Sequence, residues 1–345
     1  GMSDVLERPG VAAAAGTAGT PLVRLTDLHV KFVTRDRTVH AVNGVDMRLD
    51  AGEVLCILGE SGSGKSVTLR ALMRLLPKTA KVTGGIEVGG RDVQAMDEGQ
   101  LADFRGGDVA MIFQEPMTAL DPVFTIGRQI AETVQRHERA SRAAGMARAL
   151  ELLELVQIPS AKRRLDAYPH ELSGGLRQRA MIAVALACRP KLLLADEPTT
   201  ALDATVQIQV LLLLRRLQEQ MGMGVVFVTH DLGVAGEIAD RVAVMYAGKV
   251  VEEGPVDAMM RAPLHPYPKG LLGATVHAGM RGKRLTTIPG APPALETLPA
   301  GCAFAPRCSE AEPACLEGVP ALRGPVPGRL ARCIKVPGSR MGQEP

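Results

Sequence analysis

The stretch VLCILGESGSGKSVTLRALM, residues 54–73, decides the fold. It reads as a short apolar strand, a loop rich in glycine and serine, and an apolar helix, and the loop at 59–66 has the pattern G-x-x-x-x-G-K-[ST]. Glycines let the backbone wrap closely around a phosphate, and the start of a helix adds N–H donors and a favourable dipole. A flexible loop that merely opens a helix is the competing interpretation. The strand, the spacing, Lys65 and Ser66 together favour a nucleoside triphosphate site.

The same loop predicts which side chains touch the nucleotide. Lys65 is expected to reach the β- and γ-phosphates, and the Ser66 hydroxyl is expected to ligate Mg²⁺. The residues expected to surround the phosphates are Gly59, Ser61, Gly62, Ser63, Gly64, Lys65, Ser66 and Val67.

Two carboxylates follow a second apolar run, KLLLADE at 191–197. Ligands of open α/β sheets bind at the carboxyl ends of the strands. Asp196 is therefore expected to orient Mg²⁺ and its water, and Glu197 to polarise the attacking water. In isolation, a strand that ends in two solvated acids would be the simpler interpretation. The phosphate loop favours the interpretation that these acids are catalytic, because such a loop needs a carboxylate for its Mg²⁺. We expect that carboxylate on a neighbouring strand.

Length and composition exclude several classes of protein. A chain of 345 residues has room for about two structural units. A net charge of +3, 3% aromatic residues and no Trp argue against a nucleic-acid binder that works through bulk charge or base stacking. No apolar run is long enough to span a bilayer, and the first twenty residues lack the apolar core of a secretory signal. We expect a reducing cytosol, where clustered cysteines bind metal or do redox chemistry more often than they form disulfides.

Alternating strand-like and helical stretches from Pro21 to about Ala247 predict an α/β domain with a largely parallel sheet. Between Asp121 and Ser173 helix formers dominate, which indicates an inserted helical subdomain. After Val251 the chain becomes rich in proline, so its tail is expected to form neither long helices nor central strands. The expected buried strands are 54–58, 109–113, 192–195 and 225–228.

The run LSGGLRQR at 172–179 resembles the signature of the ATP-binding cassette (ABC) family. Other elements follow the same order and spacing. Gln114 resembles the Q-loop glutamine of that family, Asp203 its D-loop aspartate and His230 its switch histidine. The resemblance implies a P-loop NTPase fold with a RecA-like core, an antiparallel β subdomain and an inserted helical subdomain.

The resemblance also implies the roles of these residues. Gln114 would touch Mg²⁺ and the water, His230 would hold the γ-phosphate, and Asp203 would act across a dimer. The signature would hold ATP bound to a partner subunit through Ser173, Gly174, Gly175 and Gln178. Because the chain has one phosphate loop and one signature, a second homologous cassette, identical or paralogous, is required. Phe32 is the candidate for the aromatic that stacks on adenine, although a Phe on a strand is most often a core residue.

The tail closely resembles the C-terminal extension of peptide-importer ATPases in three runs, at 263–272, 288–293 and 298–308. This implies an ATP-hydrolysing subunit at the cytoplasmic face of a membrane, working with two permeases and a substrate-binding protein, on di- or oligopeptides or related solutes such as nickel, opines or glutathione. A soluble ABC ATPase acting on ribosomes or DNA, or an exporter subunit, is the alternative. The expected divisions are a disordered leader at 1–20, the ATPase domain at 21–254, with its helical subdomain at about 121–173, and the extension at 255–345.

Four of the six cysteines lie in this extension: Cys302, Cys308, Cys315 and Cys333. Their spacing matches neither common zinc modules nor the standard ferredoxin runs, so a [4Fe–4S] cluster, a structural zinc and four free thiols all remain open. The resemblance favours the [4Fe–4S] cluster, with a structural role because the tail has no other evident way to fold. Cys56 and Cys188 are expected to be small core residues.

Overall fold

The computed structural model describes residues 19–113, 119–199, 202–278 and 288–337. Most of the predicted leader and the predicted Q-loop residue Gln114 lie outside this part of the chain. Within it, no helix is long and apolar enough to cross a membrane.

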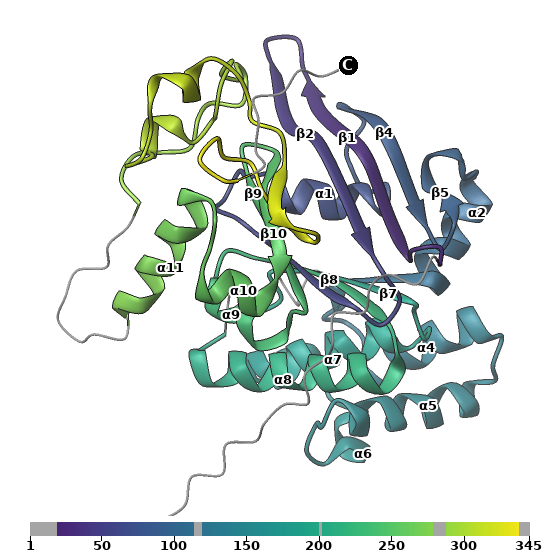
Figure 1. Cartoon of the computed structure of the whole chain (residues 1–345). Coiled ribbons are helices and arrows are strands. Elements are labelled where there is room, and N and C mark those ends of the chain that lie inside the picture. Colours follow the sequence, from purple (N-terminus) through teal and green to yellow (C-terminus); the bar gives the residue numbers. More distant parts are fainter. Residues whose placement is uncertain (1–18, 114–118, 200–201, 279–287, 338–345) are drawn as a thin grey trace, which may run out of the picture.

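An eight-stranded sheet forms the centre of the molecule (Figure 1). Its strand order is β6-β7-β8-β3-β9-β10-β12-β11, in which the first five strands are parallel and the last three pair antiparallel. The strands are β3 (Val54–Leu58), β6 (Val109–Ile112), β7 (Leu192–Asp196), β8 (Gly224–Thr229), β9 (Arg241–Tyr246), β10 (Lys249–Pro255), β11 (Arg323–Val326) and β12 (Arg329–Ala331). The four predicted strands are therefore confirmed to within one residue at each end, as expected for short apolar runs buried on both faces.

A second, antiparallel sheet of four strands has the order β2-β1-β4-β5. Its strands are β1 (Val23–Val33), β2 (Thr38–Leu49), β4 (Ala80–Val88) and β5 (Arg91–Asp92). Alternate residues of β1, among them Val23, Leu25 and Val30, are buried and face the central sheet. The sequence thus forms the predicted antiparallel β layer by period-two alternation, which a bulge between Leu25 and Leu28 interrupts once in β1.

The central sheet separates two hydrophobic cores, because successive side chains of a strand point to opposite faces. In β3, Leu55 and Ile57 join the core shared with the second sheet, whereas Val54, Cys56 and Leu58 join the other core. The first core also takes in α1 (Lys65–Ala71), α2 (Glu98–Asp103), the 3₁₀ turn η1 (Val93–Ala95) and the π turn η2 (Phe104–Asp108).

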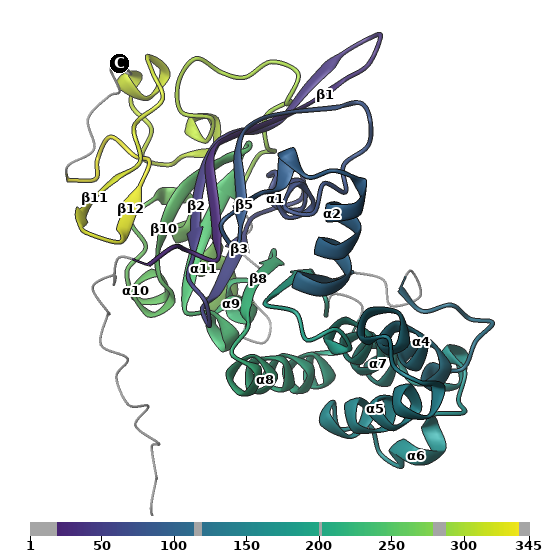
Figure 2. The ribbon, with the colours of Figure 1, turned by 90° about the vertical axis from the view of Figure 1, so that its right-hand side faces the viewer.

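The second core is covered by the remaining helices of the ATPase region. These are α4 (Ile126–Glu138), α5 (Arg142–Leu155), α6 (Ala161–Arg164), α7 (Gly174–Leu186), α8 (Ala204–Met221), α9 (Leu232–Ile238) and α10 (Val256–Arg261), with the 3₁₀ turn η3 (Pro169–Glu171). Helices α1 and α7 therefore lie on opposite faces of the sheet, as both views show (Figures 1 and 2).

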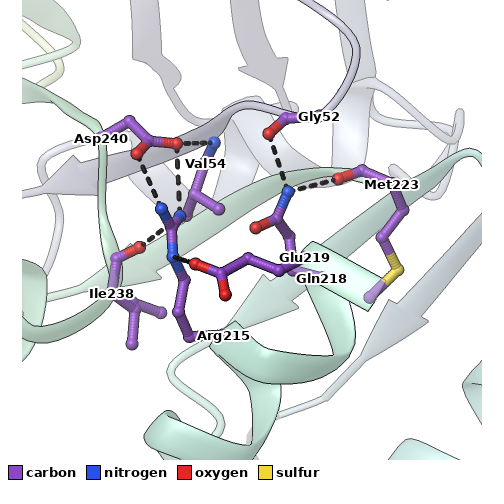
Figure 3. A network of polar contacts seen from close by, with 8 residues as sticks. All are labelled: Gly52, Val54, Arg215, Gln218, Glu219, Met223, Ile238 and Asp240. Atoms are coloured by element: carbon purple, nitrogen blue, oxygen red, sulfur yellow. Dashed lines mark hydrogen bonds and ion pairs between the residues drawn. The ribbon is translucent and has the colours of Figure 1, made fainter. Parts of the chain in front are cut away.

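A polar network holds α8 against the start of β3 (Figure 3). Arg215 donates to both carboxylate oxygens of Asp240, at 2.9 and 3.3 Å, and to the carbonyl oxygen of Ile238 at 3.1 Å. Asp240 in turn accepts from the Val54 amide at 2.9 Å. Gln218 donates to the carbonyl of Gly52 at 2.7 Å. The strand that leads into the phosphate loop thus has a fixed starting point.

The C-terminal residues form α11 (Pro266–Ala278), two 3₁₀ turns, η4 (Ala305–Arg307) and η5 (Pro313–Leu316), and the strands β12 and β11, of which β11 is the edge of the sheet. Among the described residues from 288 onwards, the proline-rich part has neither a long helix nor a central strand, as predicted. Nearer Val251 the prediction is wrong, because α11 has 13 residues and its prolines, Pro266 and Pro268, lie in the first turn, where a missing N–H costs nothing. The premise that this tail has no other way to fold is wrong. β12 pairs with β10, and the buried ring of Phe304 packs against Tyr246 and Tyr267, with ring centroids 5.3 and 5.4 Å apart.

Candidate functional site

The phosphate loop lies between β3 and α1, as the sequence predicts. Gly62 and Gly64 have φ of 81° and 94°, a left-handed conformation that glycine adopts at no steric cost. A Cβ at Gly64 would collide with the carbonyl oxygen of Ala41, so the loop has no room for a larger residue there. The Ser63 hydroxyl is buried and has no hydrogen-bond partner among the described residues. A buried, unpartnered donor inside a glycine-rich cradle fits a loop that binds phosphate.

Ser66 and Asp196 meet at the start of α1. The Ser66 hydroxyl donates to Asp196 Oδ1 at 2.9 Å, and Asp196 is 5% exposed. Arg70 adds a guanidinium 3.8 Å from Asp196 Oδ2. A hydroxyl and a carboxylate oxygen are hard ligands that suit Mg²⁺, so these two residues fit the predicted metal position.

The expectation that Asp196 comes from a neighbouring strand is wrong. β8 lies between β3 and β7 in the sheet, so the phosphate-loop strand and the carboxylate strand do not pair. Ser66 reaches Asp196 from α1, which packs across β8 and β7.

The Glu197 carboxylate lies close to two further polar side chains, His230 and Lys65. Its Oε1 lies 3.0 Å from His230 Nδ1 and 3.5 Å from Lys65 Nζ. Lys65 is buried, whereas the His230 side chain is 55% exposed. Glu197 also has φ of 44°, a conformation that costs a residue with a side chain about 1–2 kcal/mol. Its amide donates to the carbonyl of Val228 at 2.9 Å, which helps to hold this strained position beside the phosphate loop.

The predicted signature residues lie at the start of α7. Ser173 caps the helix, with its hydroxyl accepting from the Leu176 amide at 3.3 Å, and Gly174 and Gly175 are the first helical residues. A Cβ at Gly175 would lie 2.6 Å from Val206 of α8, so a side chain there would separate the two helices. Gln178 is 1% exposed, and its Nε2 has no hydrogen-bond partner among the described residues. Its contact with a partner nucleotide stays a prediction.

Two further predicted residues have local structural roles. Asp203 is exposed and caps α8, its carboxylate accepting from the Val206 amide at 3.0 Å. Phe32 is half-buried near the end of β1 and packs against the first core. Neither observation tests the dimer role of Asp203 or the adenine contact of Phe32.

The four cysteines of the extension line one pocket, together with His265, Phe304 and Lys335. Burial raises the pKa of the thiols of Cys302, Cys308 and Cys333, and the neighbouring thiols raise it further. However, no three His, Cys, Asp or Glu side chains in the described parts of the chain are grouped closely enough to hold a metal ion. As placed, the four thiols share a pocket but do not form a set of ligands. Cys56 is a core residue, as predicted, and Cys188 is half-buried just beyond the end of α7.

Sequence reasoning missed two residues that contact the phosphate loop through one of its own members, Glu60. They are Tyr267 and Arg307, both in the C-terminal extension, and Arg307 also donates to the Tyr246 hydroxyl of β9. The only sequence signal was the position of Arg307 beside Cys308 in a run already assigned to the extension.

Comparison with known proteins gives the same picture over most of the chain. The ABC transporter profile matches residues 42–200, and the profile of the oligopeptide/dipeptide transporter C-terminal region matches residues 251–315. A Brucella melitensis ATP-binding protein named for peptide import is 50% identical over 328 residues, which cover 91% of this chain and 97% of that protein. The oligopeptide transport ATP-binding protein OppD of Salmonella typhimurium is 45% identical over 94% of this chain and 96% of its own length.

A solved structure has the same core fold. The ATP-binding cassette MJ0796, seen as a dimer in a post-hydrolysis state with ADP and phosphate, is similar with a TM-score of 0.61 and 31% sequence identity. The similarity covers 68% of this chain and 98% of that one.

Proposed function

The chain belongs to the family of ABC transporter ATP-binding proteins, and we propose that it energises an importer of the peptide class as its ATP-hydrolysing subunit. The observation that supports hydrolysis best is the arrangement around the phosphate loop. Ser66 with Asp196 and Glu197 with His230 form two adjacent polar pairs, each joined by a single short hydrogen bond. The division into ATPase domain and extension that we predict at 254/255 is part of this proposal.

Each pair has a separate task in the proposed reaction. Ser66 and Asp196 would hold Mg²⁺, which neutralises charge that develops on the transferred phosphoryl group. The phosphate loop and Lys65 bind the triphosphate, and Glu197 accepts a proton from the attacking water. His230 is within hydrogen-bond distance of Glu197 and can hold both that carboxylate and the γ-phosphate in place.

A second cassette is required for a geometric reason. The phosphate loop opens α1 on one face of the central sheet, and the predicted signature opens α7 on the other. A rigid chain therefore cannot bring its signature to its own phosphates. We propose that Ser173, Gly174, Gly175 and Gln178 complete the site of a partner cassette, as Asp203 does across the same interface. Gln114 and Phe32 are proposed to contact Mg²⁺ and adenine in the chain's own site.

Reconstitution tests the transport proposal. The two permeases are inserted into liposomes, and the chain and its partner cassette are bound to them at the membrane surface. This complex should hydrolyse ATP faster when a peptide-loaded binding protein is added. The Glu197→Gln complex is the matched control and should show no such response. Stimulation by ribosomes or DNA, or ATP-driven export from the liposomes, would overturn the import assignment.

The metal in the cysteine pocket is a separate proposal. We propose a [4Fe–4S] cluster, with zinc as the alternative, supported by four thiols on one pocket. Because the side chains do not already form a ligand set, a cluster would have to draw them together. Chain purified without oxygen should be brown and should lose its iron when Cys308 is replaced by Ser. A colourless chain that holds one equivalent of zinc would contradict the iron assignment.

A further inference from the structure

The C-terminal extension holds one residue of the phosphate loop, Glu60, on two sides. Arg307 donates to both carboxylate oxygens of Glu60, with Nη1–Oε2 at 2.8 Å and Nη2–Oε1 at 3.1 Å. The Glu60 amide donates to the Tyr267 hydroxyl at 3.0 Å. Glu60 also contacts Lys65, because its carbonyl oxygen accepts a hydrogen bond from Lys65 Nζ at 3.3 Å. Glu60 thus connects the extension, on one side, to the lysine expected to bind the phosphates, on the other.

The Arg307 guanidinium is fixed in this position. Its side chain is 5% exposed, Nε donates to the carbonyl of Pro289 at 3.1 Å, and Nη2 donates to the carbonyl of Ile288 at 3.2 Å. Its guanidinium also lies 5.9 Å from the centroid of the Tyr246 ring. The hydrogen bonds to Glu60 raise the pKa of Arg307 above its ordinary value. The Glu60 side chain is 30% exposed, but the buried guanidinium and the bidentate geometry distinguish this pair from a solvated surface ion pair, whose effect is small.

Residues 288–307 of the extension also contact the hairpin formed by β1 and β2, and Phe32 lies in β1 of this hairpin. The His40 amide donates to the carbonyl of Leu295 at 2.9 Å, and Arg37 pairs with Glu296 at 3.2 Å. Residues 288–307 therefore contact both the phosphate loop and the hairpin next to it.

We propose that Arg307 is a positioning residue for ATP binding, and that it acts by neutralising and orienting Glu60 in the phosphate loop. The physical reason is electrostatic. A triphosphate is strongly negative, and an unpaired carboxylate in the loop that binds it would repel it. Arg307 masks that carboxylate, and Tyr267 and Arg307 together keep the loop in its phosphate-binding conformation. This role of Arg307 lies in the ATPase site and does not depend on what the transporter carries.

The alternative is that the pair merely fastens the extension to the ATPase domain. The two explanations differ in what happens when the carboxylate is removed as well. If Arg307 masks a repulsive charge, Glu60→Gln should rescue the loss caused by Arg307→Ala. If Arg307 is only a fastener, removing the second partner cannot restore ATP binding.

The test is the steady-state ATPase rate of the assembled transporter over a range of Mg-ATP concentrations. Arg307→Ala should raise the half-saturating ATP concentration about tenfold, with a smaller effect on the maximal rate, and the double variant with Glu60→Gln should return to within about threefold of the parent. Lys269→Ala is the matched control, because it breaks an exposed ion pair of the extension with Glu310 at 3.7 Å and should change nothing.

Tyr267→Phe tests the same inference without removing a charge, so it decides the matter if Arg307→Ala fails to fold. It takes the acceptor away from the Glu60 amide and should raise the half-saturating ATP concentration about threefold. An unchanged value in Tyr267→Phe, or a double variant no better than Arg307→Ala alone, would overturn the proposal.

Discussion

Replacing Phe304 by Ala is the most direct way to ask whether packing folds the C-terminal extension. Phe304 is 3% exposed, and its ring lies among those of Tyr246, Tyr267 and His265, with centroids 5.3, 5.4 and 5.8 Å away. The first of these contacts is edge-to-face, at 85°. The ring therefore joins β9 to the extension through a buried aromatic cluster.

The expected cost follows from that burial. Phe-to-Ala changes in protein cores cost about 3–5 kcal/mol, which combines lost transfer free energy with the cavity that remains. Edge-to-face aromatic pairs add about 0.5–1.5 kcal/mol beyond area burial, so the upper half of the range applies here. Leu316→Ala is the matched control in the same extension, because Leu316 is 64% exposed and its loss should stay within about 0.5 kcal/mol.

The chain offers a convenient local probe for this measurement. It has three Tyr and no Trp, and two of the three tyrosines belong to the cluster. Urea unfolding followed by tyrosine fluorescence therefore reports mainly on the aromatic cluster where the extension packs against β9, whereas far-UV circular dichroism reports on the whole chain. We expect Phe304→Ala to shift the tyrosine transition to lower urea by more than the circular-dichroism transition. A loss below about 1 kcal/mol in the tyrosine transition would refute packing as the main fastener and would favour a metal in the cysteine pocket.

Glu197→Gln should lower the ATPase rate of the assembled complex by about 10²–10⁴-fold, the range for loss of a general base, and a rate within a few-fold of the parent would exclude Glu197 from that role. Arg215→Met should lower the free energy of unfolding by about 1–3 kcal/mol in urea titrations, because Asp240 loses both guanidinium hydrogen bonds; no loss would mean that the network in Figure 3 is not stabilising. Burial lowers the pKa of His265 to about 3, so the unfolded chain binds a proton that the folded chain does not, and stability should fall by about 1.4 kcal/mol per unit as the pH drops from 6.5 towards 3. Urea titrations at several pH values should show a shallower fall for His265→Gln, and equal slopes in parent and variant would contradict the assignment.

The sequence predicts best what is set by neighbouring residues. The ends of β3 follow from an apolar run bounded by Glu53 and Gly59, and the helix after the loop follows from the motif itself. The proximity of Ser66 and Asp196 follows from the chemistry that a phosphate loop needs, although the strand order that brings them together does not. Because the phosphate loop needs a carboxylate, the sequence predicts that Ser66 and Asp196 meet. It does not predict that α1 carries Ser66 across β8 to reach Asp196.

Long-range contacts in the extension could not be predicted in the same way. Glu60 and Arg307 are 247 positions apart, and nothing near either residue marks it as a partner. β12 is three residues long, too short to show the alternation that identifies a strand, and it exists because the edge of β10 offers unpaired backbone groups. The structural role expected of the cysteines rested on the premise that the tail has no other way to fold, and the buried rings beside them were not evident from the sequence because they come from segments far apart in the chain.

The C-terminal extension both covers the edge of the central sheet and contacts the phosphate loop. β10 would otherwise be the exposed edge of the central sheet, and such edges promote aggregation. β12 covers that edge, and β11, which carries Pro325 and only four residues, ends the sheet with a strand poorly suited to further pairing. Between α11 and these strands, the same segment presents Arg307 to Glu60. One continuous segment of the chain therefore covers the sheet edge and also contacts the phosphate loop.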